Sequence, residues 1–218
     1  MEEGHATFQS EKGEGAVDEI FIAKPEGGSR QQIRKEMGLT DADIVIIGVG
    51  RLVKRKNWNE ALQGCGRVAQ KHKNIRFILI GDGPERKALE KFAWTVGCPI
   101  MFVGYQSQQA MLDFYQAADI LIQTSTYDPS PKVLNEALGV GLPMIVSSSV
   151  GTAGEICVHE VNGFVYPKGE IDVLQKAISV LVESKELRGL YGNASKELSE
   201  KWSITVGVRN IIQALDEN

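Results

Sequence analysis

The stretch AADILIQTSTYDPSPKVLNEALGVGLPMIVSSSV, residues 117–150, decides the fold of this chain. Its order of apolar and polar segments predicts a strand, a loop, a helix and a second strand. The apolar run Ile120–Ile122 ends in a loop rich in turn-forming residues, as expected for a strand that is buried on both faces. The helix is predicted to begin at Ser130 and Pro131, with the serine as N-cap and the proline in the first turn. It ends at a Gly-Val-Gly sequence, and the second strand follows over residues 142–146.

Charged residues and free amides gather where this helix begins. Asp128 and Glu136 are two carboxylates eight positions apart. Lys132 and Val133 stand in the first turn, where backbone N–H groups have no partner within the helix and the helix dipole is positive. Such amides bind phosphate, and carboxylates accept hydrogen bonds from hydroxyl groups. The stretch therefore indicates a site for a phosphorylated, polyhydroxylated ligand.

Strands and helices alternate along the rest of the chain. The other strands are predicted over residues 43–49, 74–80, 100–103 and 163–166, and the helices over 29–37, 57–72, 84–96, from 107 onward, 171–183, 185–201 and 203–215. Short buried strands that alternate with helices predict an α/β fold with a doubly wound, Rossmann-like parallel sheet. We expect a connector over residues 1–28, one domain over 29–200 and a C-terminal helix over 201–218.

The composition excludes several classes of protein. The net charge of −4 over 218 residues argues against a general nucleic-acid binder, whose affinity depends on a basic surface. No apolar run approaches the roughly 20 residues that span a bilayer, and the N-terminus lacks the apolar segment of a secretory signal, so we expect a cytoplasmic protein. Cys65, Cys98 and Cys157 have no metal-ligand spacing, which predicts buried free thiols and no metal site.

Ligands of open α/β sheets bind beyond the carboxyl ends of the strands. After the first predicted strand come Gly50, Arg51, Lys54, Arg55 and Lys56, with four cations in six positions. The spacing fits neither the dinucleotide-binding pattern nor a P-loop. Cations beside a glycine can clamp a diphosphate without a metal, and a solvated basic turn is the alternative interpretation.

Weaker signals follow the next two strands. Gly83 lies in the Gly-Asp-Gly-Pro turn of residues 81–84, which alone indicates a tight turn. Gly104 and Tyr105 follow the third strand, where the tyrosine could lie against a nucleobase or be an ordinary packing residue. Residues 41–43 match an Asp-x-Asp metal pattern, but they stand at the start of a strand. Because that is the wrong edge of the sheet for a ligand, we reject them as a metal site.

An ordered series of motifs connects these elements. They are Gly-Arg-Leu at 50–52 followed by Lys56, Gly-Asp-Gly-Pro at 81–84, Val-Gly at 103–104, Ala-Asp at 118–119, Asp-x7-Glu at 128–136, Glu-Ala-Leu-Gly-Val-Gly-Leu-Pro at 136–143, Gly-Thr-Ala-Gly-Glu at 151–155 and Asn-Gly-Phe-Val at 162–165. In this order they make the chain resemble the C-terminal, nucleotide-sugar-binding half of a retaining glycosyltransferase of the large family 4, which has the GT-B architecture. The resemblance covers about residues 15–185.

The resemblance implies a role for each candidate residue. Arg51 and Lys56 would neutralise the diphosphate of the sugar donor, and Glu136 would accept hydrogen bonds from the ribose. Asp128 would hold hydroxyls of the transferred sugar, although it is one methylene shorter than the family's usual glutamate. The remaining nucleotide-binding candidates are Gly50, Gly83, Gly104, Tyr105, Ser130, Lys132 and Val133.

The function expected from the resemblance is metal-independent, retaining transfer from a UDP- or GDP-sugar, without a cofactor. Residues 14–21 resemble the linker between the two domains of the family, so the acceptor-binding N-terminal domain is expected to be missing. The isolated chain would then be inactive, and peripheral membrane association would reside in the other domain. The alternatives are a non-catalytic nucleotide-sugar-binding module that needs a partner subunit, or another GT-B enzyme such as a sugar-nucleotide epimerase or a phosphorylase.

Overall fold

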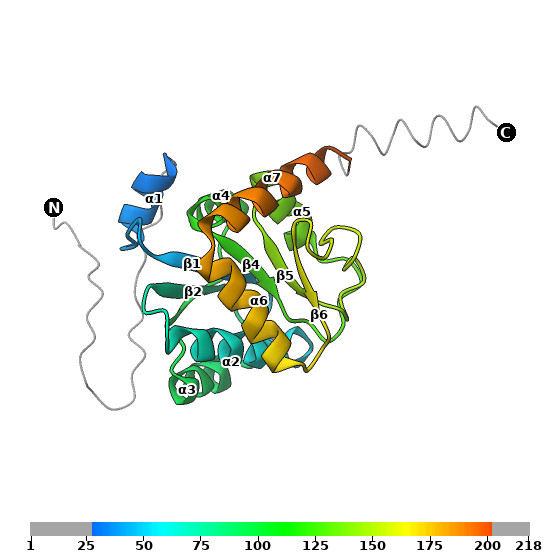
Figure 1. The fold of residues 1–218 in the computed structure, drawn as a ribbon. Coiled ribbons are helices and arrows are strands. Elements are labelled where there is room, and N and C mark those ends of the chain that lie inside the picture. Colours follow the sequence, from blue (N-terminus) through cyan, green and yellow to red (C-terminus); the bar gives the residue numbers. More distant parts are fainter. Residues whose placement is uncertain (1–27, 202–218) are drawn as a thin grey trace.

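Six parallel strands form one sheet in the part of the chain that the structure, a computed structural model, describes, residues 28–201 (Figure 1). The strands are β1 Ile44–Val49, β2 Ile75–Ile80, β3 Ile100–Gly104, β4 Ile120–Gln123, β5 Met144–Ser147 and β6 Gly163–Tyr166. Their order is β3-β2-β1-β4-β5-β6, and every neighbouring pair is parallel. The chain therefore winds in two directions from the centre of the sheet, between β1 and β4, as predicted for a doubly wound fold.

Helices cover both faces of the sheet. They are α1 Arg30–Glu36, the 3₁₀ turn η1 Lys54–Lys56, α2 Trp58–Ala69, α3 Arg86–Val96, α4 Gln108–Ala117, α5 Lys132–Val140, α6 Ile171–Glu183 and α7 Lys185–Lys201. One buried cluster joins the sheet to α2, α3 and α6, and a second joins its other face to α1, α4 and α5. In Figure 1, α6 crosses one face of the sheet and α7 continues from it past α5.

Alternate strand residues supply the two clusters. Ile120 and Ile122 belong to the cluster with α2 and α6, whereas Leu121 between them belongs to the cluster with α4 and α5. This follows from the two-residue repeat of a strand, and it explains why residues 120–122 of β4 are apolar without a break. The predicted connector and the predicted helix over 203–215 lie outside the described residues, except for Gly28 of the connector.

Two of the helix starts are capped as their sequences suggest. The Ser29 hydroxyl accepts a hydrogen bond from the Gln32 amide at 3.3 Å, and Ser107 accepts one from the Ala110 amide at 3.4 Å. Both serines satisfy an amide that would otherwise lack a partner in the first helical turn.

The predicted cap of α5 is wrong. The helix begins at Lys132, and its N-cap is Pro131 in extended backbone (φ −72°, ψ 120°), without a side-chain cap. The reason is a contact distant in sequence: Asp128 forms a β-bridge with Val150, and the Gly151 amide donates to the Asp128 carbonyl at 2.8 Å. This pairing keeps the chain extended before α5.

The sequence predicts Asn57 as the N-cap of α2, and the structure differs from this prediction too. Asn57 does precede the helix, but it adopts the left-handed conformation (φ 51°, ψ 43°) and caps no amide with its side chain. Its side-chain amide donates instead to the Glu60 carboxylate. Two further elements begin two residues later than predicted, α3 at Arg86 and β5 at Met144.

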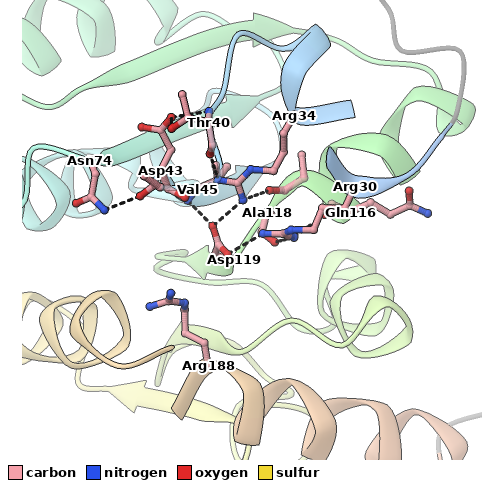
Figure 2. A network of polar contacts seen from close by, with 12 residues as sticks. Arg30, Arg34, Thr40, Asp43, Val45, Asn74, Gln116, Ala118, Asp119 and Arg188 are labelled. Atoms are coloured by element: carbon pink, nitrogen blue, oxygen red, sulfur yellow. Dashed lines mark hydrogen bonds and ion pairs between the residues drawn. The ribbon is translucent and has the colours of Figure 1, made fainter. Parts of the chain in front are cut away.

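Asp119 fastens α1 to the amino edge of the sheet (Figure 2). Its carboxylate accepts hydrogen bonds from Arg30 (2.7 Å), Arg34 (3.2 Å) and the Val45 amide of β1 (2.8 Å). Arg34, which is buried, also donates to the carbonyls of Ala117, Thr40 and Asp43. The Ala-Asp motif at 118–119 is therefore a structural anchor.

A glycine controls how closely the loops after β1 and β2 approach each other. Gly81 has a φ of 131°, and a Cβ there would lie 2.1 Å from the Gly50 carbonyl oxygen. Gly81→Ala should lower the free energy of unfolding by about 3 kcal/mol, because it combines a strained φ with a backbone clash. Gly97→Ala is the matched control: its φ of 62° is also positive, but no atom lies within 4 Å of the added Cβ. It should cost about 1 kcal/mol in urea unfolding, and equal losses would contradict the steric argument.

Candidate functional site

The loops that follow the first three strands form one connected ledge at the carboxyl edge of the sheet. The Gly50 amide donates to the Ile80 carbonyl (2.9 Å), and the Gly81 amide donates to the Gly104 carbonyl (2.8 Å). Gly83 packs against the first loop, since a Cβ there would lie 2.4 Å from the Leu52 carbonyl oxygen. The structure thus brings Gly50, Gly83 and Gly104 to the same ledge.

Lys56 and Asp128 form a buried ion pair between the exits of β1 and β4. The lysine Nζ lies 2.6 Å from an oxygen of Asp128, and the two side chains are 10% and 11% exposed. Gly50 leaves room for this lysine, since a Cβ at Gly50 would lie 3.1 Å from the lysine Cε. The residues predicted to bind the diphosphate and the sugar therefore contact each other.

Two threonines hold the η1 turn in place. The Thr124 hydroxyl donates to the carbonyls of Lys56 and Asn57, both at 3.0 Å, and the Thr126 amide donates to the Arg55 carbonyl at 2.8 Å. These contacts tie the β1 exit loop to the β4 exit loop and so position Lys56. We did not predict them from the sequence, although the Thr-Ser-Thr run at 124–126 was a usable signal.

The Arg51 side chain does not take part in these contacts between the two loops. Its side chain is exposed, and it forms no ion pair or hydrogen bond with any residue of 28–201. Its carbonyl accepts a 3.2 Å hydrogen bond from the Trp58 indole, which fixes the backbone of the loop. Arg51 is thus a cation on a fixed backbone with its donors unused.

The start of α5 carries the free amides that the sequence predicted. Within residues 28–201, neither the Lys132 amide nor the Val133 amide donates to an acceptor, whereas Leu134 bonds back to the Pro131 carbonyl at 3.1 Å. Ser130 and Lys132 are exposed. Because the positive end of the helix dipole is also here, this helix start can hold an anion.

Glu136 lies one turn further along α5 and is exposed. Its Oε2 accepts a hydrogen bond of 2.5 Å from the hydroxyl of Tyr115, a buried residue of α4. Burial and the neighbouring carboxylate raise the pKa of Tyr115, so the phenol stays protonated and donates. Tyr115 was not predicted from the sequence as a functional residue.

The two exposed tyrosines at this edge differ in position. Tyr105 is 85% exposed at the exit of β3, an outer strand that β2 and β1 separate from β4. The structure does not bring it into contact with the residues at the start of α5, and its role at a nucleobase stays a prediction. Tyr127 is 66% exposed in the loop between β4 and α5, and it was not predicted.

A surface hollow of about 720 Å³ lies at the opposite, amino edge of the sheet, with Arg30, Asp119 and Arg188 in its lining. Three of its charged groups are engaged within the chain: Arg188 donates to the Leu181 carbonyl at 2.6 Å, and Arg30 pairs with Asp119 (Figure 2). Tyr115, which bonds to Glu136, also stands in its lining, but the hollow lies where the strands begin. Because ligands of this fold bind where the strands end, we place the candidate site at the carboxyl edge and not in this hollow.

The remaining sequence predictions concern metals and thiols. In the described part of the chain, no three His, Cys, Asp or Glu side chains are grouped so that they could hold a metal ion. Asp43 of the rejected metal pattern accepts hydrogen bonds from Thr40 and pairs with Arg76. All three cysteines are buried and free, as predicted, and burial raises the pKa of Cys157 to about 12.

Fold and site together define a class: a doubly wound α/β domain whose carboxyl edge presents cations, free helix amides and carboxylates. The sequence pattern of the family described as "Glycosyl transferases group 1" matches residues 29–198. The chain belongs to this family.

Relatives and solved structures agree with this assignment. An uncharacterized glycosyltransferase of Methanocaldococcus jannaschii is 31% identical over 78% of the chain and 44% of its own length. A GDP-mannose-dependent phosphatidylinositol monomannoside mannosyltransferase of Corynebacterium glutamicum is 28% identical over 96% of the chain and 57% of its own length. The structure of Anabaena HepE in complex with UDP shares the fold, with a TM-score of 0.75 at 23% identity over 87% of the chain and 52% of that protein.

The chain spans about half or less of the length of the first curated relatives that it matches, 44% and 47% for two of them. The predicted resemblance to the C-terminal domain of a GT-B glycosyltransferase is confirmed at the level of family and fold. Among the helices of residues 28–201, none is long and apolar enough to cross a membrane.

Proposed function

We propose that this chain is the sugar-donor-binding domain of a retaining, metal-independent glycosyltransferase that uses a UDP- or GDP-sugar. The observation that carries the proposal is the meeting of Lys56, Asp128 and the free amides of α5 where β1 and β4 end. The centre of a doubly wound sheet, where the strand order reverses, is the usual ligand position of this fold.

The relatives support a nucleoside diphosphate as the bound group. HepE was solved with UDP, with UDP and glucose, and with UDP-glucose, and the Corynebacterium relative depends on GDP-mannose. UDP-glucose and GDP-mannose share a ribose and a diphosphate, and they differ in the base and in the sugar. We therefore propose contacts with the diphosphate and the ribose, and the donor nucleotide is either UDP or GDP.

The cations and the carboxylates have different tasks in this proposal. Arg51, Lys56 and the amides of Lys132 and Val133 receive the diphosphate, whose negative charge grows as the glycosidic bond breaks. Fixed cations and amides then stabilise the transition state more than the ground state. Lys56 starts from its ion pair with Asp128, so the diphosphate competes with this carboxylate for the lysine. When the lysine turns to the diphosphate, the Asp128 carboxylate becomes able to accept hydrogen bonds from the hydroxyls of the sugar.

Calorimetric titration with UDP, GDP and ADP tests the proposal. At least one of the first two should bind the folded 218-residue chain, and chelation with EDTA should leave the affinity unchanged. If no nucleoside diphosphate binds at millimolar concentration, the proposed function is wrong.

Arg51→Ala should weaken binding of the nucleoside diphosphate about ten- to a hundredfold, because a charge-assisted hydrogen bond contributes roughly 1.5–3 kcal/mol. Arg55→Ala is the matched control. Arg55 is an exposed arginine of the same loop, and its backbone carbonyl accepts a hydrogen bond from the Thr126 amide, a contact that the substitution keeps. It should change the affinity less than about threefold, in keeping with a solvated charge. Equal losses in both variants would point to a diffuse basic surface instead of a diphosphate clamp.

The acceptor site is assigned to a second domain or subunit, which also carries any peripheral membrane contact of this cytoplasmic enzyme. The relatives are about twice as long as the matched region, and the described site occupies one sheet edge. The chain should therefore bind a sugar nucleotide without transferring the sugar. Transfer to an added acceptor by the purified chain alone would contradict this part of the proposal.

A further inference from the structure

Tyr115 and Glu136 form a tyrosine–carboxylate pair between two helices on the same face of the sheet. The Tyr115 hydroxyl on α4 donates to Oε2 of Glu136 on α5. Tyr115 is 3% exposed and belongs to the buried cluster that contains Leu134, Ala137 and Leu138 of α5. The hydroxyl is therefore held by a packed ring, while its acceptor stands on the exposed side of a helix.

Glu136 would have no fixed orientation without this contact. In residues 28–201 no other group bonds to its carboxylate, and an exposed glutamate samples several rotamers, whose loss on binding opposes the binding of a ligand. The hydrogen bond engages Oε2 and leaves Oε1 able to accept. A carboxylate held in this way is prepared for a hydroxyl ligand before the ligand arrives.

The geometry points to Tyr115 as a positioning residue for ribose recognition: it orients the Glu136 carboxylate so that this group accepts hydrogen bonds from the ribose hydroxyls of the nucleotide. This inference rests on the proposed function, because it assigns the ribose to Glu136. Tyr115 itself does not touch the nucleotide. Its contribution should consequently vanish when either the carboxylate or the ribose hydroxyls are removed.

The test compares nucleotides that differ only in these hydroxyls. UDP and GDP are titrated into the full chain, and the tighter ligand is compared with its 2′,3′-dideoxy analogue. Tyr115→Phe should weaken binding of the normal nucleotide about tenfold, as expected for losing one oriented, charge-assisted contact. It should change binding of the dideoxy analogue less than about twofold, since that ligand has nothing for Glu136 to hold.

A double-mutant cycle gives the second readout. Glu136→Ala alters an exposed side chain, and adding Tyr115→Phe to it should produce no further loss of affinity. Tyr166→Phe is the matched control, because Tyr166 is also buried and donates to a glutamate, Glu60, at 2.8 Å on the other face of the sheet. It should leave the ratio of the two ligands' affinities unchanged.

The outcomes separate the inference from the proposed function. Equal weakening of both nucleotides by Tyr115→Phe would make the tyrosine merely structural, and an unchanged affinity for both would show that it positions nothing. Either result overturns the inference while wild-type binding upholds the site. If the wild-type chain binds neither UDP nor GDP, the proposed function fails, and the inference fails with it.

Discussion

Lys56→Met should lower the free energy of unfolding by about 3 kcal/mol, because it leaves the Asp128 carboxylate buried without its counter-charge. The lysine and the aspartate are 10% and 11% exposed and lie 2.6 Å apart, so neither charge is well solvated. Urea unfolding of the 218-residue chain, followed by circular dichroism, measures the loss. A loss below about 1 kcal/mol would mean that the pair behaves as a surface ion pair.

The double variant Lys56→Met with Asp128→Leu separates stability from binding. Removing both charges should restore most of the stability, since apolar residues of similar volume often replace a buried ion pair without loss. It should not restore binding of UDP or GDP, because the lysine is proposed to receive the diphosphate. Recovery of both properties in the double variant would contradict a role for Lys56 in binding.

Asp119→Ala should lower the free energy of unfolding by about 3 kcal/mol. The substitution leaves the Arg34 guanidinium, whose side chain is 4% exposed, without its carboxylate. It also removes the acceptor of the Val45 amide in β1. Thermal or urea unfolding measures the loss of stability. The contacts that are removed lie at the amino edge of the sheet (Figure 2).

Two controls make this expectation specific. Asp119→Asn keeps an oxygen for the Val45 amide and removes the charge, so it should cost less than Asp119→Ala. Asp172→Ala removes the partner of Arg67 from an ion pair whose aspartate is 91% exposed, and it should cost less than about 0.5 kcal/mol. If Asp119→Ala were as mild as Asp172→Ala, the network around α1 would contribute little to stability.

The strands and helices could be predicted because their signals are local. β6 and α6 have the predicted bounds, and α7 begins at the predicted residue, since each apolar repeat is confined to one element. The start of α5 could not be predicted, because a contact of Asp128 with Val150 keeps the preceding chain extended. The unexpected conformation of Asn57 likewise accompanies contacts of the η1 turn with Thr124 in another loop.

The site was predictable to the extent that parallel strands place their carboxyl ends on one edge. This principle alone predicts that Arg51, Lys56, Asp128 and Glu136 lie at the same edge. The side-chain pairings could not be predicted from the sequence. Lys56 and Asp128 are 72 positions apart, and Tyr115 contacts Glu136 only because α4 and α5 face each other. Helical periodicity shows which side of a helix is buried, but it does not show which polar tip finds a partner.

The strand order has a consequence for synthesis of the chain. β1 lies at the centre of the sheet, yet its neighbour β4 is made much later, as Val45 and Asp119 are 74 positions apart. At 5–20 residues per second, a ribosome exposes one side of β1 for roughly 4–15 s before its partner strand exists. An unpaired apolar strand edge is a template for pairing with another chain. The nascent chain is therefore most open to aggregation, and to protection by chaperones, during this interval.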